Sequence, residues 1–334
     1  MDKKFVVNLF KKFESLNIMV IGDVMLDSYL WGKVERISPE APVPVVSCHK
    51  KENRLGGAAN VALNLKSLGA KPLMYAAIGA DSQGGTILEL MQKDQLAADM
   101  IIKDKTRKTT CKTRVISGSQ QLLRIDEESN HFLSKAVEKK LTENILNSLD
   151  HGKIHAIIFQ DYDKGVITPT LIENVVKKAQ KLNIPILADP KKRNFARYMG
   201  VSLFKPNFKE FTEGLKTDID AGDAKSLVAR AKKFLEKTSN KLLLLTLSDK
   251  GLFISDGKKF SLIPAHSRDI ADVSGAGDTV ISIAALCIAA GCNPAEIAAI
   301  SNLAGGLVCE KVGVVPIARK HFMDECFNLE IPKW

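Results

Sequence analysis

The sequence has no hydrophobic run long enough to cross a membrane. The longest apolar stretch inside a helix-like segment, residues 280–290, is far shorter than the roughly 20 residues that a spanning helix needs. The opening segment MDKKFVVNLFKKFESLN is interrupted by too many charges to be a secretory signal. We therefore predict a cytoplasmic protein that has no membrane partner.

The cysteines show neither the pattern of a metal site nor that of a redox pair. None of the six forms a CxxC pair, and no histidine lies at metal-ligand spacing from one. Three of them lie in apolar, helix-like sequence, where a free cysteine behaves as a small hydrophobic residue. We predict six reduced thiols, at Cys48, Cys111, Cys287, Cys292, Cys309 and Cys326.

The signatures of nucleic-acid binders and of two large kinase classes are missing as well. The net charge is +10, but the lysines are spread over many segments, and no RNP, zinc-finger or helix-turn-helix signature accompanies them. We predict no nucleic-acid partner; a positive field would instead concentrate ATP and phosphorylated substrates. A Walker A motif, an HRD/DFG set and GxGxxG are also absent, which excludes the P-loop and protein-kinase classes.

What is present is the pattern of a globular α/β protein. With 45% hydrophobic and 26% charged residues, the 334-residue chain can bury a substantial core. Short apolar segments alternate with amphipathic, Lys/Glu-rich segments, which predicts βαβ units and a mostly parallel sheet. The expected strands are 18–22, 73–78, 156–159, 185–188 and 242–247, and the expected helices include 134–149, 169–182 and 224–237.

The ends of these strands predict where ligands bind, and two irregular segments predict a second, smaller sheet. Ligands of open parallel sheets bind beyond the carboxyl ends of the strands. Two segments break the alternation: 28–49 is extended and spaced by prolines, and 109–125 alternates around a Gly118–Ser119 turn. We expect them to form a small β-sheet lid inserted into one domain that spans 1–334. Residues that follow strand ends are Asp23, Asp161, Asp189 and Ser248.

The sharpest chemical signal is the segment DVSGAGDT at 272–279, which directly precedes an apolar helical run. Gly275, Ala276 and Gly277 would put backbone N–H groups at a helix N-terminus, which is a place that binds anions. Asp278 beside them suits phosphoryl transfer, in which donors neutralise the migrating phosphate and a carboxylate takes the hydroxyl proton. The structural alternative is a glycine-rich turn with Asp278 as a capping residue.

Three further motifs carry weaker signals. The Gly-Gly pair at 56–57 lets a ligand approach the backbone, with Asn60 one turn into the next helix; tight packing of that helix is the alternative. Asn207 and Glu210 are typical of a helix capping box, or of residues near the phosphates and magnesium of ATP. Residues 246–251 end a strand in a turn of small residues that could line a nucleotide.

Together these motifs resemble the ribokinase-like (PfkB-type) carbohydrate kinases, over essentially the whole chain. The early GGAAN and the late DxxGAGD carry the resemblance, and NxxE at 207–210 supports it. The chain departs from the family where Val273 replaces a threonine, and Gln160 and Asp163 stand where relatives often have Ser and Ala. Within the family it is most similar to kinases of D-glycero-β-D-manno-heptose 7-phosphate, through residues 22–27, 36–46, 56–62, 120–126 and 272–280.

The resemblance implies an ATP-dependent kinase that converts this heptose phosphate to its 1,7-bisphosphate, for ADP-heptose and lipopolysaccharide synthesis. Asp278 would take the proton of the anomeric C1 hydroxyl, while Gly275, Ala276 and Gly277 would stabilise the migrating phosphoryl group. ATP and Mg²⁺ would be the cofactors, with K⁺ as a further cation. Relatives can carry a second, nucleotidyltransferase domain with an HxGH motif; these 334 residues contain no such motif.

The resemblance also implies which residues hold the ligands. Asp272 would hold the monovalent cation, and Glu210 the magnesium. The heptose would contact Asp23, Asp27, Gly56, Gly57 and Asn60. Its 7-phosphate would be held by the cations Arg54, Lys112, Arg114 and Arg124. ATP would contact Asn207, Phe208, Lys209, Glu210, Thr246, Ser248 and Gly251.

The lid should exclude water from the reaction and also pair two subunits. Val43 and Val45 would leave apolar surface on an inserted sheet, which predicts a homodimer through the lid. Two alternatives remain open at this point. A kinase of another small sugar or nucleoside would use the same Asp278, whereas a non-catalytic sugar-binding regulator would be expected to have lost that acid.

Overall fold

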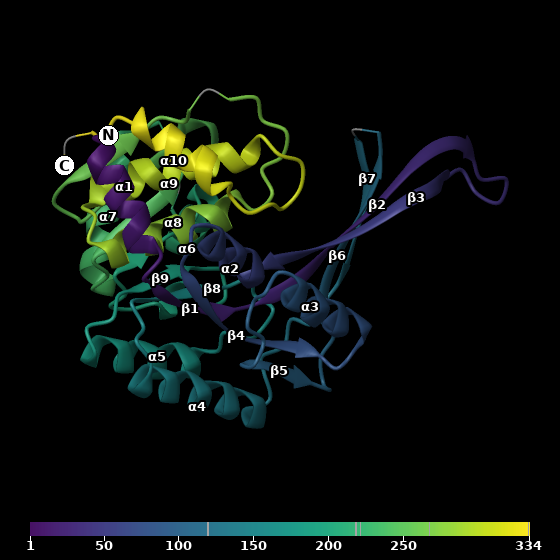
Figure 1. Cartoon of the computed structure of the whole chain (residues 1–334), viewed down its shortest axis with the longest axis horizontal. Coiled ribbons are helices and arrows are strands. Elements are labelled where there is room, and N and C mark those ends of the chain that lie inside the picture. Colours follow the sequence, from purple (N-terminus) through teal and green to yellow (C-terminus); the bar gives the residue numbers. More distant parts are fainter. Residues whose placement is uncertain (119, 218, 221, 267, 333) are drawn as a thin grey trace.

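The main sheet of the protein is built from parallel strands. A computed structural model describes residues 1–118, 120–217, 219–220, 222–266, 268–332 and 334 (Figure 1). In this part of the chain nine strands lie in the order β13-β12-β11-β10-β9-β8-β1-β4-β5, and all neighbours are parallel except that β12 runs antiparallel to both β11 and β13. The predicted mostly parallel sheet is confirmed. The strands are β1 (Asn17–Gly22), β4 (Lys71–Gly79), β5 (Ile101–Asp104), β8 (Ala156–Gln160), β9 (Ile186–Asp189), β10 (Leu203–Phe204), β11 (Leu242–Thr246), β12 (Leu252–Ser255) and β13 (Phe260–Ile263).

Helices cover both faces of this sheet, and strand residues alternate between two hydrophobic cores. In β1, Ile18 and Val20 belong to the core under α1, α2, α8, α9 and α10, whereas Met19 and Ile21 belong to the core under α4, α5 and α7. Figure 1 shows α8, α9 and α10 on one side of the sheet and α4 and α5 on the other. The helices are α1 (Lys3–Phe13), α2 (Ala58–Ser67), α3 (Ser82–Lys93), α4 (Lys135–His151), α5 (Pro169–Lys181), α6 (Phe208–Leu215), α7 (Ala224–Thr238), α8 (Ala276–Ala290), α9 (Pro294–Cys309) and α10 (Arg319–Phe327).

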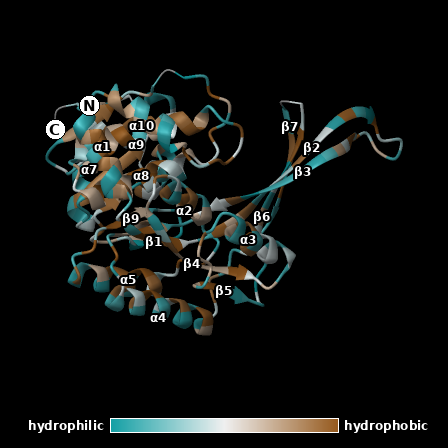
Figure 2. Cartoon of the chain, in the orientation of Figure 1, coloured by the Kyte–Doolittle hydropathy of each residue, from teal (hydrophilic) through white to brown (hydrophobic). Residues whose placement is uncertain are grey.

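Two of these helices, α8 and α9, are apolar over most of their length because they are buried on nearly all sides (Figure 2). Among the described residues, no helix combines the length and the apolar character that a bilayer crossing requires.

A second, four-stranded sheet projects from the body, with the strand order β3-β2-β6-β7 (Figure 1). It confirms the predicted small sheet, although its strands run further than the expected 28–49 and 109–125. The reason is that β2 starts directly after β1 and leaves the body as one extended strand. Ser119, in the predicted turn, lies outside the described residues. The strands are β2 (Val24–Ile37), β3 (Pro44–Gly57), β6 (Thr110–Ser117) and β7 (Gln120–Glu127).

The strand register gives this lid sheet one charged and one apolar face. Tyr29 of β2 lies opposite Arg114 of β6, which in turn lies opposite Arg124 of β7. At the adjacent position of each strand, Leu30 lies opposite Val115, which lies opposite Leu123. Because neighbours along a strand point to opposite faces, the charged and apolar rows lie on opposite sides of the sheet.

Candidate active site

Asp278 lies in the first turn of α8. Gly275 caps the helix in the left-handed conformation (φ 81°), and no side chain caps the N-terminus. A Cβ atom at position 275 would lie 2.8 Å from Nδ2 of Asn60, so the site needs glycine there for space as well as for conformation. Asp278 follows in the first turn and is only 3% exposed. The sequence motif therefore forms a helix N-terminus with a buried carboxylate, as predicted.

The carboxylate of Asp278 receives hydrogen bonds from three side chains, one on α2 and two at or just after the end of β8. Asn60 of α2 donates to Oδ2 over 2.8 Å, and Gln160 of β8 donates to Oδ1 over 2.9 Å. The hydroxyl of Tyr162 also donates to Oδ1, over 2.6 Å. The motifs at 56–60 and 272–279, far apart in the sequence, thus meet at one carboxylate.

Burial raises the pKa of Asp278 to about 6, against the hydrogen bonds from Asn60 and Tyr162, which lower it. The nearby charge of Asp189 raises this pKa further, and that of Lys205 lowers it. A carboxylate with such a pKa is mostly ionised at neutral pH, and its proton affinity is higher than that of an exposed aspartate. Both properties suit a general base.

A buried ion pair lies next to this carboxylate. Nζ of Lys205 lies 2.9 Å from Oδ2 of Asp189, and both side chains are almost fully buried. Nε2 of Gln160 is 3.4 Å from the same oxygen, so the Gln160 amide links Asp189 with Asp278. A Cβ atom on Gly277 would be 3.6 Å from the Lys205 ammonium. The pair therefore lies at the N-terminus of α8.

Asn207 and Glu210 form the capping box that the sequence allowed. The side chain of each accepts the backbone N–H of the other over 2.8 Å, at the start of α6. Glu210 also pairs with Lys191, whose ammonium lies 5.5 Å from the ring centre of Tyr162. Lys209, by contrast, is 83% exposed and faces Glu213. Phe208 packs against the core on the α4, α5 side.

The turn after β11 lies beside this capping box. Thr246 forms a parallel bridge with Asn207, which brings the two predicted ATP segments together. Ser248 and Gly251 both adopt positive φ angles, 57° and 91°, and the N–H of Gly251 donates to the carbonyl of Ser248 over 3.1 Å. The structure therefore shows the tight turn predicted from the sequence.

Asp23 holds the loop that follows β8 through hydrogen bonds to its backbone. Its Oδ2 accepts the backbone N–H groups of Tyr162 and Lys164 at 2.8 and 3.1 Å, and its Oδ1 accepts that of Val166 at 3.1 Å. Burial raises the pKa of this carboxyl, and the three backbone donors lower it. The side chain therefore positions the loop that carries Tyr162.

The two glycines before α2 lie close to the start of β2. A Cβ atom on Gly56 would lie 2.1 Å from Oδ2 of Asp27, and one on Gly57 would lie 2.4 Å from the carbonyl oxygen of Asp23. Gly57 also has a φ of 59°, which favours glycine. Both positions therefore require a residue without a side chain.

The predicted cations of the lid lie on its charged face, each beside a carboxylate. Arg114 pairs with Asp27, and Lys112 and Arg124 both pair with Asp126, at 3.0 and 2.9 Å. Arg114 is held close to the body, with a side chain only 13% exposed, whereas the Arg124 side chain is 51% exposed. Arg54 joins them next to Tyr29: its guanidinium carbon lies 4.9 Å from the Tyr29 ring centre, and that of Arg114 lies 5.4 Å away.

Asp272 and Arg54 both contact the loop that follows α9, Asp272 from the segment before α8 and Arg54 from the lid. Asp272 accepts the N–H groups of Ser274 at 2.9 Å and of Gly313 at 2.8 Å. Burial opposes the ionised form, but these hydrogen bonds keep the pKa of Asp272 below its usual range. Arg54 donates to the carbonyl oxygen of Val312 over 3.0 Å. The charged face of the lid therefore contacts the loop that follows α9.

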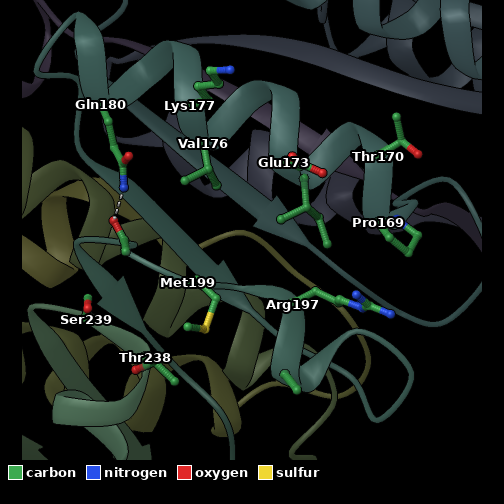
Figure 3. A pocket seen from close by; sticks show the side chains of 13 residues that line it. Pro169, Thr170, Glu173, Val176, Lys177, Gln180, Arg197, Met199, Thr238 and Ser239 are labelled. Atoms are coloured by element: carbon green, nitrogen blue, oxygen red, sulfur yellow. Dashed lines mark hydrogen bonds between the residues drawn. The ribbon is translucent and has the colours of Figure 1, made fainter.

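A surface hollow lies on another part of the molecule (Figure 3). It has a volume of about 560 Å³ and lies between α5, the segment around Arg197 and the C-terminal end of α7. Figure 3 shows Glu173, Lys177 and Met199 around it. None of the residues described above lines this hollow.

Sequence reasoning missed four side chains of this site: Gln160, Tyr162, Lys191 and Lys205. It marked Asp189 only as a residue at a strand end. A signal was present for some of them, because Gln160 ends β8 and Lys205 directly follows β10. Beyond the carboxyl ends of parallel strands is where ligands bind.

Comparisons with known proteins agree with this geometry. Residues 15–320 match the pfkB family of carbohydrate kinases. A bifunctional protein HldE of Pelobacter propionicus is 40% identical over 95% of this chain, and one of Sulfurimonas denitrificans is 41% identical over 90%. The chain spans 64% and 62% of the length of these two relatives. Phosphofructokinase-2 from Escherichia coli, in a crystal structure with potassium, superposes with a TM-score of 0.78 at 17% identity, over 94% of this chain and 98% of that one. The predicted ribokinase-like fold is confirmed.

Proposed function

The chain belongs to the pfkB family of carbohydrate kinases and is an ATP-dependent sugar kinase, and we propose that it phosphorylates D-glycero-β-D-manno-heptose 7-phosphate on its anomeric C1 hydroxyl. The products would be the 1,7-bisphosphate and ADP, for ADP-heptose and lipopolysaccharide synthesis. The observation that carries the chemistry is the buried, three-donor site of Asp278 at the N-terminus of α8. The sequence resemblance to heptose 7-phosphate kinases supports the choice of sugar.

In the proposed mechanism, Asp278 accepts the proton of the C1 hydroxyl as that oxygen attacks the γ-phosphorus of ATP. The bond from this phosphorus to the bridging oxygen breaks, and ADP leaves. Backbone N–H groups of 275–277 and the dipole of α8 would stabilise the charge on the migrating group. Lys205, beside Gly277, would add a fixed positive charge at the same place.

The expected cations suit the oxygen donors beside this site. Mg²⁺ prefers a few carboxylate oxygens together with phosphates and water, and it would neutralise charge on the phosphates of ATP. Asp189 at the end of β9 and Glu210 in the first turn of α6 offer such oxygens, although each is paired with a lysine. For K⁺, the residue that we propose is Asp272. Its two oxygens accept the N–H groups of Ser274 and Gly313, which hold the ionised carboxylate in place.

The charged face of the lid supports the proposal that the substrate is a phosphorylated sugar. Arg114 and Arg124 lie directly opposite each other on β6 and β7. Like charges in such a pair repel, and a bound phosphate dianion would relieve this repulsion with bidentate contacts. We propose that these two arginines bind the 7-phosphate, with Arg54 and Lys112 behind them, while Asn60 and Asp27 contact the sugar.

The apolar face of the lid supports the proposal that the protein forms a homodimer. Leu123 and Ile125 are 55% and 47% exposed, and Val34 and Ile37 further along β2 are 37% and 59% exposed. Beyond Gly32, β2 pairs only with β3, so the end of this ribbon has no third strand among the described residues. A second copy that pairs lid to lid would cover this surface.

An ADP-release assay tests the proposal. The chain should turn over heptose 7-phosphate much faster than fructose 6-phosphate, ribose, adenosine or unphosphorylated heptose. Preference for another member of this panel would show a different sugar or nucleoside kinase with the same base. ADP release with none of them would favour a non-catalytic sugar-binding protein. Retention of Asp278 is the reason that we rank that alternative last.

A further inference from the structure

The two residues that bind Oδ1 of Asp278 both come from the end of β8. Gln160 is the last residue of that strand, and Tyr162 follows two positions later. Their donor atoms lie 2.9 and 2.6 Å from the same carboxylate oxygen. Oδ2 receives one hydrogen bond, from Asn60. The two oxygens of the base are therefore not equivalent.

A carboxylate oxygen has about two acceptor sites. Gln160 and Tyr162 fill both sites on Oδ1, and Asn60 leaves one site open on Oδ2. We propose that Gln160 and Tyr162 are positioning residues that hold Asp278 ionised and direct the substrate hydroxyl to Oδ2. This inference rests on the proposed role of Asp278 as the base.

The structure holds both donors in place from several sides. Asp23 binds the backbone N–H of Tyr162 itself and two more in the same loop. The Lys191 ammonium lies over the Tyr162 ring, and the Gln160 amide also donates a hydrogen bond to Asp189. Burial, together with the neighbouring Asp278 charge, raises the pKa of Tyr162 well above its usual value, so the hydroxyl stays protonated and donates. Donors fixed in this way need no reorganisation when the proton moves.

A second tyrosine–aspartate pair provides a matched control. The hydroxyl of Tyr198 donates to Oδ2 of Asp161 over 2.9 Å; both of these side chains are buried, whereas Tyr162 is half-buried beside the buried Asp278. Tyr198→Phe therefore removes the same kind of hydrogen bond from a carboxylate that is not Asp278. A general effect of losing a buried tyrosine hydroxyl would appear in both variants, whereas an effect on the base would appear only in Tyr162→Phe.

The experiment measures the pKa of Asp278 directly, without substrate. Full-length protein labelled with ¹³C at the aspartate carboxyl groups is titrated by NMR, and Asp278→Asn identifies the signal. Loss of one donor to a charged acceptor should raise this pKa by about one unit in Tyr162→Phe, equivalent to about 1.4 kcal/mol. Gln160→Met should also raise the pKa of Asp278, and Tyr198→Phe should leave this pKa unchanged. The acid limb of kcat/KM should move to higher pH by the same amount.

The KM for the sugar distinguishes the two oxygens. If the hydroxyl binds Oδ2, Tyr162→Phe should leave KM unchanged. A lower KM would mean that the sugar displaces the tyrosine from Oδ1, and it would overturn the assignment of Oδ2. An unchanged Asp278 pKa in both Tyr162→Phe and Gln160→Met, with folding verified by circular dichroism, would overturn the positioning role. Failure of the proposed function looks different: sugar is not phosphorylated, or Asp278→Asn stays active, whatever the NMR titration shows.

Discussion

Replacement of Lys205 by methionine tests the buried ion pair next to the base. Lys205 and Asp189 lie 2.9 Å apart, which corresponds to an attraction of about 6 kcal/mol at an effective dielectric constant of about 20. Methionine keeps most of the side-chain volume but leaves the Asp189 carboxylate buried without its cation. Removal of one partner from such a pair typically costs about 3–5 kcal/mol of unfolding free energy. We expect the loss of unfolding free energy in Lys205→Met, measured by urea denaturation, to fall in this range.

Lys209→Met is the matched control for this variant. Its ammonium is 3.8 Å from Glu213 on the surface of α6, and an exposed pair at this spacing contributes only about 0.3–0.5 kcal/mol. The double variant Lys205→Met/Asp189→Leu should recover most of the lost stability, because it leaves no unpaired buried charge. Equal stabilities of Lys205→Met and Lys209→Met would refute the reasoning. So would a double variant less stable than Lys205→Met.

Three further predictions concern pH, substrate and assembly. Because the pKa of Asp278 is about 6 and the base works ionised, kcat/KM should be constant above this pH and fall tenfold per unit below it; a flat profile down to pH 5 would contradict this. Arg114→Ala and Arg124→Ala should each raise the KM for heptose 7-phosphate by roughly 10- to 100-fold, and Arg124→Ala should also lower kcat; unchanged KM in both would place the phosphate elsewhere. Leu123→Lys should shift sedimentation from dimer to monomer, and a wild-type monomer at micromolar concentration would exclude the lid dimer.

Much of the sheet could be predicted because each strand is a short apolar run that ends at a polar residue. The end of β1 at Gly22 and the segments at 156–160 and 186–189 are of this kind. The helix α9 was not named from the sequence. It is buried on almost every side, so its residues 294–309 lack the polar face that gives an amphipathic period. The small sheet was predicted, but the extent of its strands depends on pairing partners distant in the sequence.

The candidate site was predictable where one short segment contains the chemistry. Gly275 and Asp278 stand three residues apart, so the helix N-terminus and its carboxylate could be inferred together. Gln160 and Tyr162 reach Asp278 across more than a hundred residues of sequence, through the order of the strands and the conformation of one loop. The contact of Asp23 with the backbone N–H of Tyr162 also depends on the fold, because it joins residues 139 positions apart.

The role of Asp278 as the base of a heptose 7-phosphate kinase is tested most directly by ³¹P NMR. The reaction of ATP and heptose 7-phosphate is followed with wild type and Asp278→Asn side by side. Wild type should produce a new anomeric phosphate together with ADP. The variant, folded and with ATP affinity nearly unchanged, should be slower by about 10²- to 10⁴-fold in kcat. A variant that keeps more than about a tenth of the wild-type rate, or a wild type that forms no anomeric phosphate, would contradict the account.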